Sequence, residues 1–134
     1  GSVCESIGER AFEGCSSLTT VNFGENGQLL SIGNYAFRRC SSLTSITVPD
    51  SVTSIGDSAF DSCRSLTSIT IGEGVTSIGD SAFRECSNLT SAIFENPNGW
   101  RAGTTSLSAD KLRDTSTAAT YLRSTYGSRT WTRS

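Results

Sequence analysis

Four cysteines recur at a nearly fixed spacing, and cysteine is the most reactive side chain that this sequence repeats. Cys15, Cys40, Cys63 and Cys86 are separated by 25, 23 and 23 residues. The sequence has no histidine, which excludes Ser-His-Asp and Cys-His catalysis. It also has no Cys-x-x-Cys pair, so the spacing does not indicate a zinc site. We therefore predict that the chain is not an enzyme and has no catalytic residue, no metal site and no cofactor.

The regular spacing favours a structural role for these cysteines. A free cysteine behaves as a small apolar residue and is usually buried, whereas a reactive one needs an electropositive pocket. We predict a buried column of four free thiols. Disulfides between adjacent copies are the alternative, although stacked side chains that point the same way suit such a bridge poorly. Cys4 stands at a different position, three residues before Ile7, and we expect it to be the exception that can cross-link two molecules.

Charged residues also recur at equivalent positions. One set of acids follows the apolar run in each of the first three copies: Glu25, Asp50 and Glu73. A row of carboxylates ~5 Å apart is a candidate calcium site, but calcium needs several oxygens that converge on one point, so we interpret the set as solvated turn residues. A second set alternates in sign: Glu13, Arg38, Asp61 and Arg84. We expect it to form ion pairs between neighbouring copies, each worth only ~0.2–1 kcal/mol.

A third set of positions is polar and small, and it supplies the candidate binding residues. Each member alternates with an apolar residue in a short β-branched run, which predicts that the set points outward from a strand. The members are Thr20, Asn22, Ser45, Thr47, Ser68, Thr70, Ser91 and Ile93. Rigid sheet faces of this kind serve as binding platforms in repeat proteins. An idle face of generic strand-forming residues is the other interpretation.

These sets exist because the sequence repeats itself. A unit that begins Ser-Ile-Gly recurs from Ser6, Ser31, Ser54 and Ser77, and the first copy is two residues longer than the others. We divide the chain into repeats 3–30, 31–53, 54–76 and 77–99, followed by a distinct segment, 100–134. Identical apolar columns at a fixed period predict copies that stack and bury one continuous core.

Local pattern predicts the elements of each copy. Residues 66–71 alternate polar and apolar side chains at their end and predict a short strand. Residues 72–74 predict a turn, and residues 75–78 a second extended piece on the opposite side. Asp80 to Phe83 predicts a single helical turn with Asp80 as its N-cap, as do the equivalent residues of the other copies. The two extra residues of the first copy predict a loop at 24–28.

Residues 100–134 do not follow the sequence repeat, and we predict that they form a C-terminal cap. A stack of repeats exposes an apolar end unless something covers it. We expect a helical turn at 108–112, a helix capped by Thr115 or Thr117 that closes near Gly127, and a strand at 130–132. The covering side chains would be Trp100, Leu107, Leu112, Tyr121, Leu122, Tyr126 and Trp131. A separate functional module is the alternative.

The repeated pattern IGxxAFxxCxxLTSIxI resembles the leucine-rich-repeat superfamily, and within it the BspA-like class of bacterial and protist surface proteins. The resemblance covers residues 3–94. It implies an α/β leucine-rich-repeat solenoid, a right-handed parallel coil of about four repeats whose sheet lines the concave face. It also implies surface display and adhesion or protein binding, with a protein ligand on host or neighbouring cells. The alternative is a structural spacer and cap of a larger surface protein with no ligand of its own.

Charge and composition limit the other partners. Residues 1–99 hold eleven acids and five bases, and residues 100–134 hold two acids and six bases. Neither part is dense enough in charge to indicate nucleic acid binding, and no apolar run approaches the ~20 residues of a membrane helix. Gly1-Ser2 resembles a cloning scar, so we interpret the chain as an excerpt whose N-terminal edge is exposed and can self-associate. We expect the parent protein to be extracellular or on the cell surface.

Overall fold

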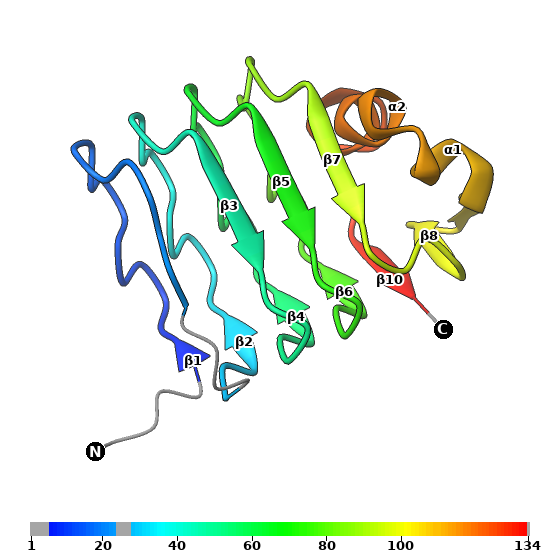
Figure 1. Cartoon of the computed structure of the whole chain (residues 1–134), viewed down its shortest axis with the longest axis horizontal. Coiled ribbons are helices and arrows are strands. Elements are labelled where there is room, and N and C mark those ends of the chain that lie inside the picture. Colours follow the sequence, from blue (N-terminus) through cyan, green and yellow to red (C-terminus); the bar gives the residue numbers. More distant parts are fainter. Residues whose placement is uncertain (1–5, 24–27, 134) are drawn as a thin grey trace.

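The chain forms a solenoid of about four stacked turns that ends in a short helical segment (Figure 1). The computed structural model describes residues 6–23 and 28–133. The predictions for Cys4, for Glu25 and for all but the last residue of the loop at 24–28 lie outside these residues. The predicted α/β leucine-rich-repeat fold class is confirmed.

A three-stranded parallel sheet runs along one side of the stack. It consists of β3 (Ser45–Val48), β5 (Ser68–Ile71) and β7 (Ser91–Phe94). The predicted strand at the end of residues 66–71 is therefore confirmed. The equivalent segment of the first copy, residues 20–23, is not a strand, although the sequence predicted one there.

A second sheet lies on the other side, where the sequence predicted only isolated extended pieces. Four two-residue parallel strands begin it: β1 (Ser6–Ile7), β2 (Ser31–Ile32), β4 (Ser54–Ile55) and β6 (Ser77–Ile78). Three strands from the C-terminal segment continue it: β10 (Trp131–Arg133), β8 (Trp100–Ala102) and β9 (Thr105–Ser106). The turns of the solenoid are thus held by backbone ladders on both sides.

The predicted single helical turn after Asp80 is wrong. Ser81 has a φ of 57°, which is the left-handed region and ends any right-handed helix there. The chain instead makes i→i+3 turns, such as the Phe83 carbonyl accepting from the Cys86 N–H at 3.2 Å. The acidic side chain does not cap its own copy either, because Asp57 Oδ1 accepts the N–H of Asp80 in the next copy at 3.0 Å.

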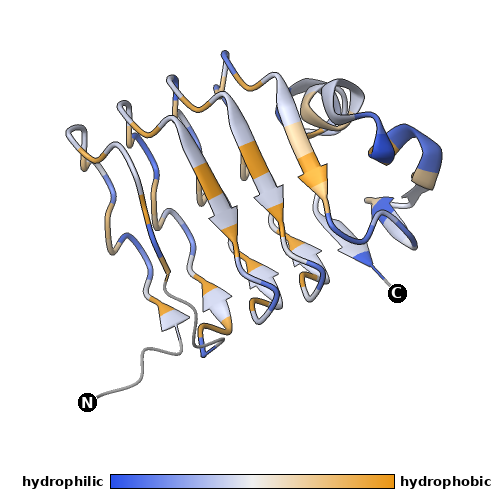
Figure 2. Cartoon of the chain, viewed as in Figure 1, coloured by the Kyte–Doolittle hydropathy of each residue, from blue (hydrophilic) through white to orange (hydrophobic). Residues whose placement is uncertain are grey.

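Hydrophobic residues recur at the same place in successive turns (Figure 2), and their side chains stack from copy to copy and form the core. The rings of Phe37, Phe60 and Phe83 lie 5.3 Å apart and within 4° of parallel. Glycine is needed where neighbouring copies approach most closely. A Cβ on Gly56 would lie 2.5 Å from the backbone nitrogen of Asn34, closer than real Cβ atoms come to any neighbour.

The first copy is the least buried part of the stack. Its Phe12 ring stacks on Phe37 at 5.3 Å but remains 41% exposed, whereas Phe60 is fully buried. Val21 and Phe23 are only partly buried. The first copy therefore leaves an apolar edge that faces solvent.

The C-terminal segment covers the opposite end. β10 pairs antiparallel with β6, and Trp131 stacks on Phe94 with ring centroids 5.8 Å apart. Trp100 lies against both rings, and each tryptophan is 1% exposed. The predicted strand at 130–132 is thus present, while the β8–β9 hairpin was not predicted.

Three short helical segments complete this end: α1 (Ala109–Arg113), α2 (Thr115–Thr120) and the π-helix η1 (Tyr121–Thr125). The predicted N-cap of the second helix is wrong by one position. Asp114, rather than Thr115 or Thr117, accepts the N–H groups of Ser116 and Thr117. A carboxylate is a better acceptor than a hydroxyl for the unpaired N–H groups of a first helical turn.

Candidate functional site

The outward face of β3, β5 and β7 carries two aligned rows of short side chains. The strand register places Ser45, Ser68 and Ser91 in one row. It places Thr47, Thr70 and Ile93 in the other. We call these six residues the platform. The structure therefore brings together six of the eight residues that the sequence predicted as a binding face.

The platform is held rigidly from below. Its residues alternate with Ile46, Ile69 and Ala92, which are at most 4% exposed. The platform itself is at least partly open to solvent, and Ile93 is 43% exposed. A fixed backbone and short side chains leave little conformational entropy to lose when a partner binds.

Thr20 and Asn22, the other two predicted residues, are exposed but lie off the sheet. Between their segment and β3 there is an open cleft of about 470 Å³. Its lining comprises Thr20, Val21, Asn22, Phe23, Ser45, Ile46, Thr47 and Pro49. The sequence did not predict this cleft. The feature of the sequence that could have indicated the cleft is the greater length of the first copy, because its extra residues directly follow Phe23.

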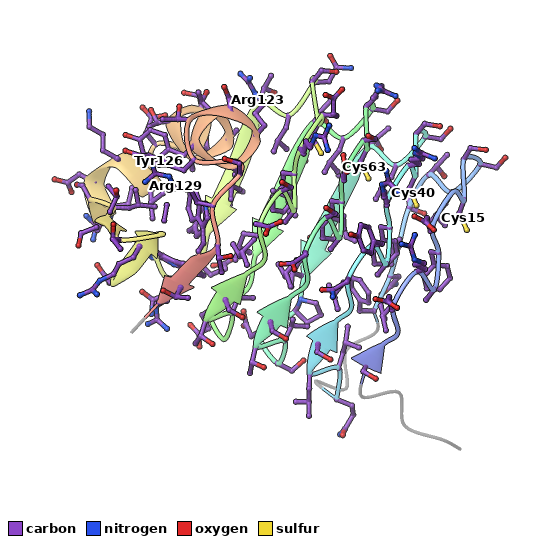
Figure 3. The ribbon with its side chains drawn as sticks, turned by 180° about the vertical axis from the view of Figure 1, so that it is seen from behind. Cys15, Cys40, Cys63, Arg123, Tyr126 and Arg129 are labelled. Carbon is purple, nitrogen blue, oxygen red and sulfur yellow. The ribbon has the colours of Figure 1, made fainter. Side chains whose placement is uncertain are left out.

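The cysteine column is built into the core rather than into a site (Figure 3). Cys40, Cys63 and Cys86 are at most 1% exposed, and all four cysteines are free thiols. The thiol of Cys40 donates to the carbonyl oxygen of Phe12 at 3.2 Å, and that of Cys86 to the oxygen of Phe60 at 3.0 Å. Each cysteine thus ties its turn to the preceding one. Cys15 is only half-buried, which corrects the prediction for that residue, because the outer side of the first copy is open.

Burial keeps these thiols protonated. Loss of hydration raises the pKa of Cys40 to about 11 and that of Cys86 to about 12, and it raises the pKa of Cys63 as well. The thiolate is the nucleophilic form of cysteine. Buried thiols with raised pKa values are therefore poor nucleophiles at neutral pH.

The alternating charged column forms ion pairs over three of its four members. Arg38 lies 3.3 Å from a carboxylate oxygen of Glu13 and 3.4 Å from one of Asp61. Arg10 also binds Glu13, and this hydrogen bond lowers the pKa of the Glu13 carboxyl. Arg84 forms no such pair within residues 6–23 and 28–133.

The acids of the turns bind backbone groups. Asp50 Oδ1 accepts the N–H of Glu73 at 2.9 Å, so this carboxylate joins two copies. In the described residues no three His, Cys, Asp or Glu side chains converge as a metal site would require. None of the helices in this part of the chain has the length and apolar character needed to cross a bilayer.

A family of known repeat sequences shares this pattern. Residues 2–110 match the model described as "BspA type Leucine rich repeat region (6 copies)". This match extends over most of the 134 residues. The chain belongs to the BspA-type leucine-rich-repeat family. The resemblance carried by the IGxxAFxxCxxLTSIxI pattern is therefore confirmed.

Solved structures of bacterial leucine-rich-repeat proteins resemble the chain. A leucine-rich-repeat protein from Bacteroides ovatus is 39% identical with a TM-score of 0.63, and the match covers 66% of this chain and 22% of that one. The T. pallidum leucine-rich-repeat protein is 31% identical with a TM-score of 0.55, over 65% of this chain and 50% of that one. The pneumococcal vaccine antigen PcpA shares the fold. It is 22% identical with a TM-score of 0.51, and the match covers 72% of this chain and 30% of that one. None of the curated proteins matches the chain.

This BspA-type chain therefore spans at most half the length of these relatives. Proteins of the repeat family are generally non-enzymatic. The family and its neighbours suggest a surface repeat protein.

Proposed function

We propose that this chain is a non-enzymatic part of a secreted or cell-surface protein and binds a protein partner through the platform. The observation that carries the proposal is the pair of aligned rows, Ser45-Ser68-Ser91 and Thr47-Thr70-Ile93, on a sheet face that is at least partly open to solvent along its length. The partner is a protein on a host or neighbouring cell.

The chemistry of the platform suits a protein surface. Its hydroxyl groups both donate and accept hydrogen bonds, and Ile93 adds an exposed apolar contact at one end. The cleft beside Thr20 and Asn22 adds a concave region at the other end. An apolar anchor, a pocket and a polar surround are features of protein interfaces.

A spacer role is the second candidate. It is supported by the way β10 and the two tryptophans close one end of the stack. In that case the chain would hold other domains away from the cell and would bind nothing through its sheet.

Lysine substitutions on the platform separate these two functions. Thr47→Lys and Thr70→Lys each place a long charged side chain on the platform without touching the core. Thr53→Lys and Thr76→Lys are matched controls, because both threonines are exposed and precede strands of the other sheet. Each platform variant should weaken binding to the target cells by roughly tenfold, about 1.4 kcal/mol, while the controls bind normally. If all four variants bind as the original chain does, the spacer role replaces the binding role.

We also propose that the open edge of the first copy pairs with a second molecule of this chain. Beside the half-exposed Phe12 there is a cleft of about 270 Å³, lined by Ile7, Phe12, Val21, Asn22, Phe23 and Leu29. Burial of such an apolar edge favours association. Sedimentation velocity should show a concentration-dependent dimer that Phe12→Lys abolishes and Ile93→Lys retains. A monomer at all concentrations would refute this pairing.

A further inference from the structure

Two backbone N–H groups of the last repeat have no acceptor in the described part of the chain, although the equivalent N–H groups of the second and third copies each donate to the copy that follows. In the second copy, the N–H groups of Tyr35, Phe37 and Arg39 donate to the next copy at 2.9, 2.8 and 2.8 Å. The equivalent groups of the third copy do the same. In the fourth copy Ser81 donates to Gly127 at 2.9 Å. Within the described residues, the N–H groups of Phe83 and Glu85 have no such acceptor.

Two adjoining depressions lie against the last repeat. The first measures about 230 Å³ and is lined by Ser81, Arg84, Arg123, Ser124, Gly127 and Ser128. The second measures about 280 Å³ and is lined by Glu85, Cys86, Ser87, Arg123 and Ser124. Because Arg123 and Ser124 line both, the two depressions form one groove between the last repeat and η1. We call it the cap groove.

The cap groove is positively charged at its first depression. No acid lines that depression, whereas Arg84 and Arg123 both do. Arg123 is held in place because its Nε donates to the carbonyl oxygen of Leu89 at 2.9 Å (Figure 3). This bond leaves the terminal nitrogens of the guanidinium available to a ligand.

Two acids close to Arg84 are paired with other arginines, and Asp80, next to Ser81, lines neither depression. Glu85, in the second depression, lies 3.4 Å from Arg64. Asp61, the residue that precedes Arg84 in the alternating column, lies 3.4 Å from Arg38. Arg84 therefore closes the alternating column without an anion of its own within residues 6–23 and 28–133.

We propose that the cap groove binds a tetrahedral oxyanion, the phosphate or sulfate group of a ligand. Arginine pairs strongly with such groups. Glu85, whose N–H has no acceptor among the described residues, lines the second depression and adds a backbone donor there. The hydroxyls of Ser81, Ser124 and Ser128 supply further donors. A volume of about 230 Å³ admits the group with its first bridging waters. The site is independent of the platform.

Titration with inorganic phosphate and with sulfate, at matched ionic strength in chloride, tests the proposal. Amide NMR shifts should change at Arg84, Glu85, Arg123 and Ser124 and should yield a millimolar or tighter Kd. Arg84→Gln should weaken binding roughly tenfold, about 1.4 kcal/mol. Arg84 is exposed and makes no ion pair with the described part of the chain, so this variant should fold normally. Arg123→Gln should weaken binding as well, but it also removes the bond to Leu89.

Two exposed arginines elsewhere provide matched controls. Arg39→Gln and Arg101→Gln remove the same charge outside the cap groove and should leave the Kd unchanged. Binding of phosphate alone identifies a phosphate ester as the source of the group, and binding of sulfate alone identifies a sulfate ester. If neither anion shifts these amides, or if the control variants weaken binding as much as Arg84→Gln, the proposal is overturned.

Discussion

The thiol of Cys63 donates a hydrogen bond to the carbonyl oxygen of Phe37, 3.1 Å away in the preceding copy. Cys40 and Cys86 repeat this contact with Phe12 and Phe60. The column therefore uses cysteine for two properties at once, its small apolar volume and its weak donor. Neither property requires a reactive thiol.

The thiols of the inner copies should be protected from modification. In a Cys4→Ser background, native protein should react rapidly at Cys15, which is half-buried, and slowly at Cys40, Cys63 and Cys86. Denatured protein should react at all four positions. Quantitative labelling with a thiol reagent, followed by mass spectrometry, measures each site. Rapid native labelling of Cys63 would show that the column is not a closed core.

Stability should fall in alkaline solution because of these thiols. The folded pKa of Cys86, about 12, lies above the ordinary value of about 8.5. Above pH ~8.5 the unfolded chain loses a proton that the folded chain keeps, so the free energy of unfolding decreases until the folded pKa is reached. From pH ~7.5 to ~10 the Cys86→Ala variant should lose about 1–2 kcal/mol less than the original chain. Urea denaturation at both pH values measures the difference, and equal losses would contradict it.

Two phenylalanines in one column should differ in their contribution to stability. Phe60→Ala removes a fully buried ring that stacks on rings at both faces. It should cost about 3–5 kcal/mol. Phe12→Ala removes a ring that is 41% exposed and stacks on one face, and should cost at most about half as much. Equal losses in urea denaturation would indicate that the first copy is covered in solution.

The C-terminal segment should be required for a stable monomer. Removal of residues 100–134 removes β10, the strand that pairs with β6. It also exposes Phe94, which is only 6% exposed in the intact chain. The truncated chain should aggregate or melt at a much lower temperature, since a domain has only ~5–15 kcal/mol of net stability. Trp131→Ala should act in the same direction by about 3–5 kcal/mol. A monomeric truncation with an unchanged melting temperature would favour a separate module over a cap.

The repeats were predictable from sequence because each buried position recurs in all four copies with an apolar residue. Ile69, Ile71 and their counterparts alternate with polar residues, and this pattern fixed which face of β5 points inward. The turn after Asp80 was not predictable in the same way. A left-handed φ at Ser81 is imposed by bonds to the neighbouring turn, and a serine there carries no local signal for it.

The candidate site was predictable where it lies on regular strands and not elsewhere. The outward rows follow from strand alternation alone. The departure of residues 20–23 from the sheet could not be inferred in this way, because these residues alternate polar and apolar side chains as the later strands do. The cap groove depends on how η1 packs against the last repeat. Residues 100–134, which include η1, do not follow the sequence repeat, so the position of η1 could not be inferred from it.

The claim that the platform is the binding face can be tested directly by site-specific cross-linking. A photoreactive amino acid replaces Thr70 on the platform or, as the control, Thr76 beside the other sheet, and each variant is irradiated on target cells. Our account predicts one saturable cross-linked cell-surface protein from position 70, displaced by excess unmodified chain, and none from position 76. Cross-linking of a displaceable partner from position 76 and not from position 70 would contradict it.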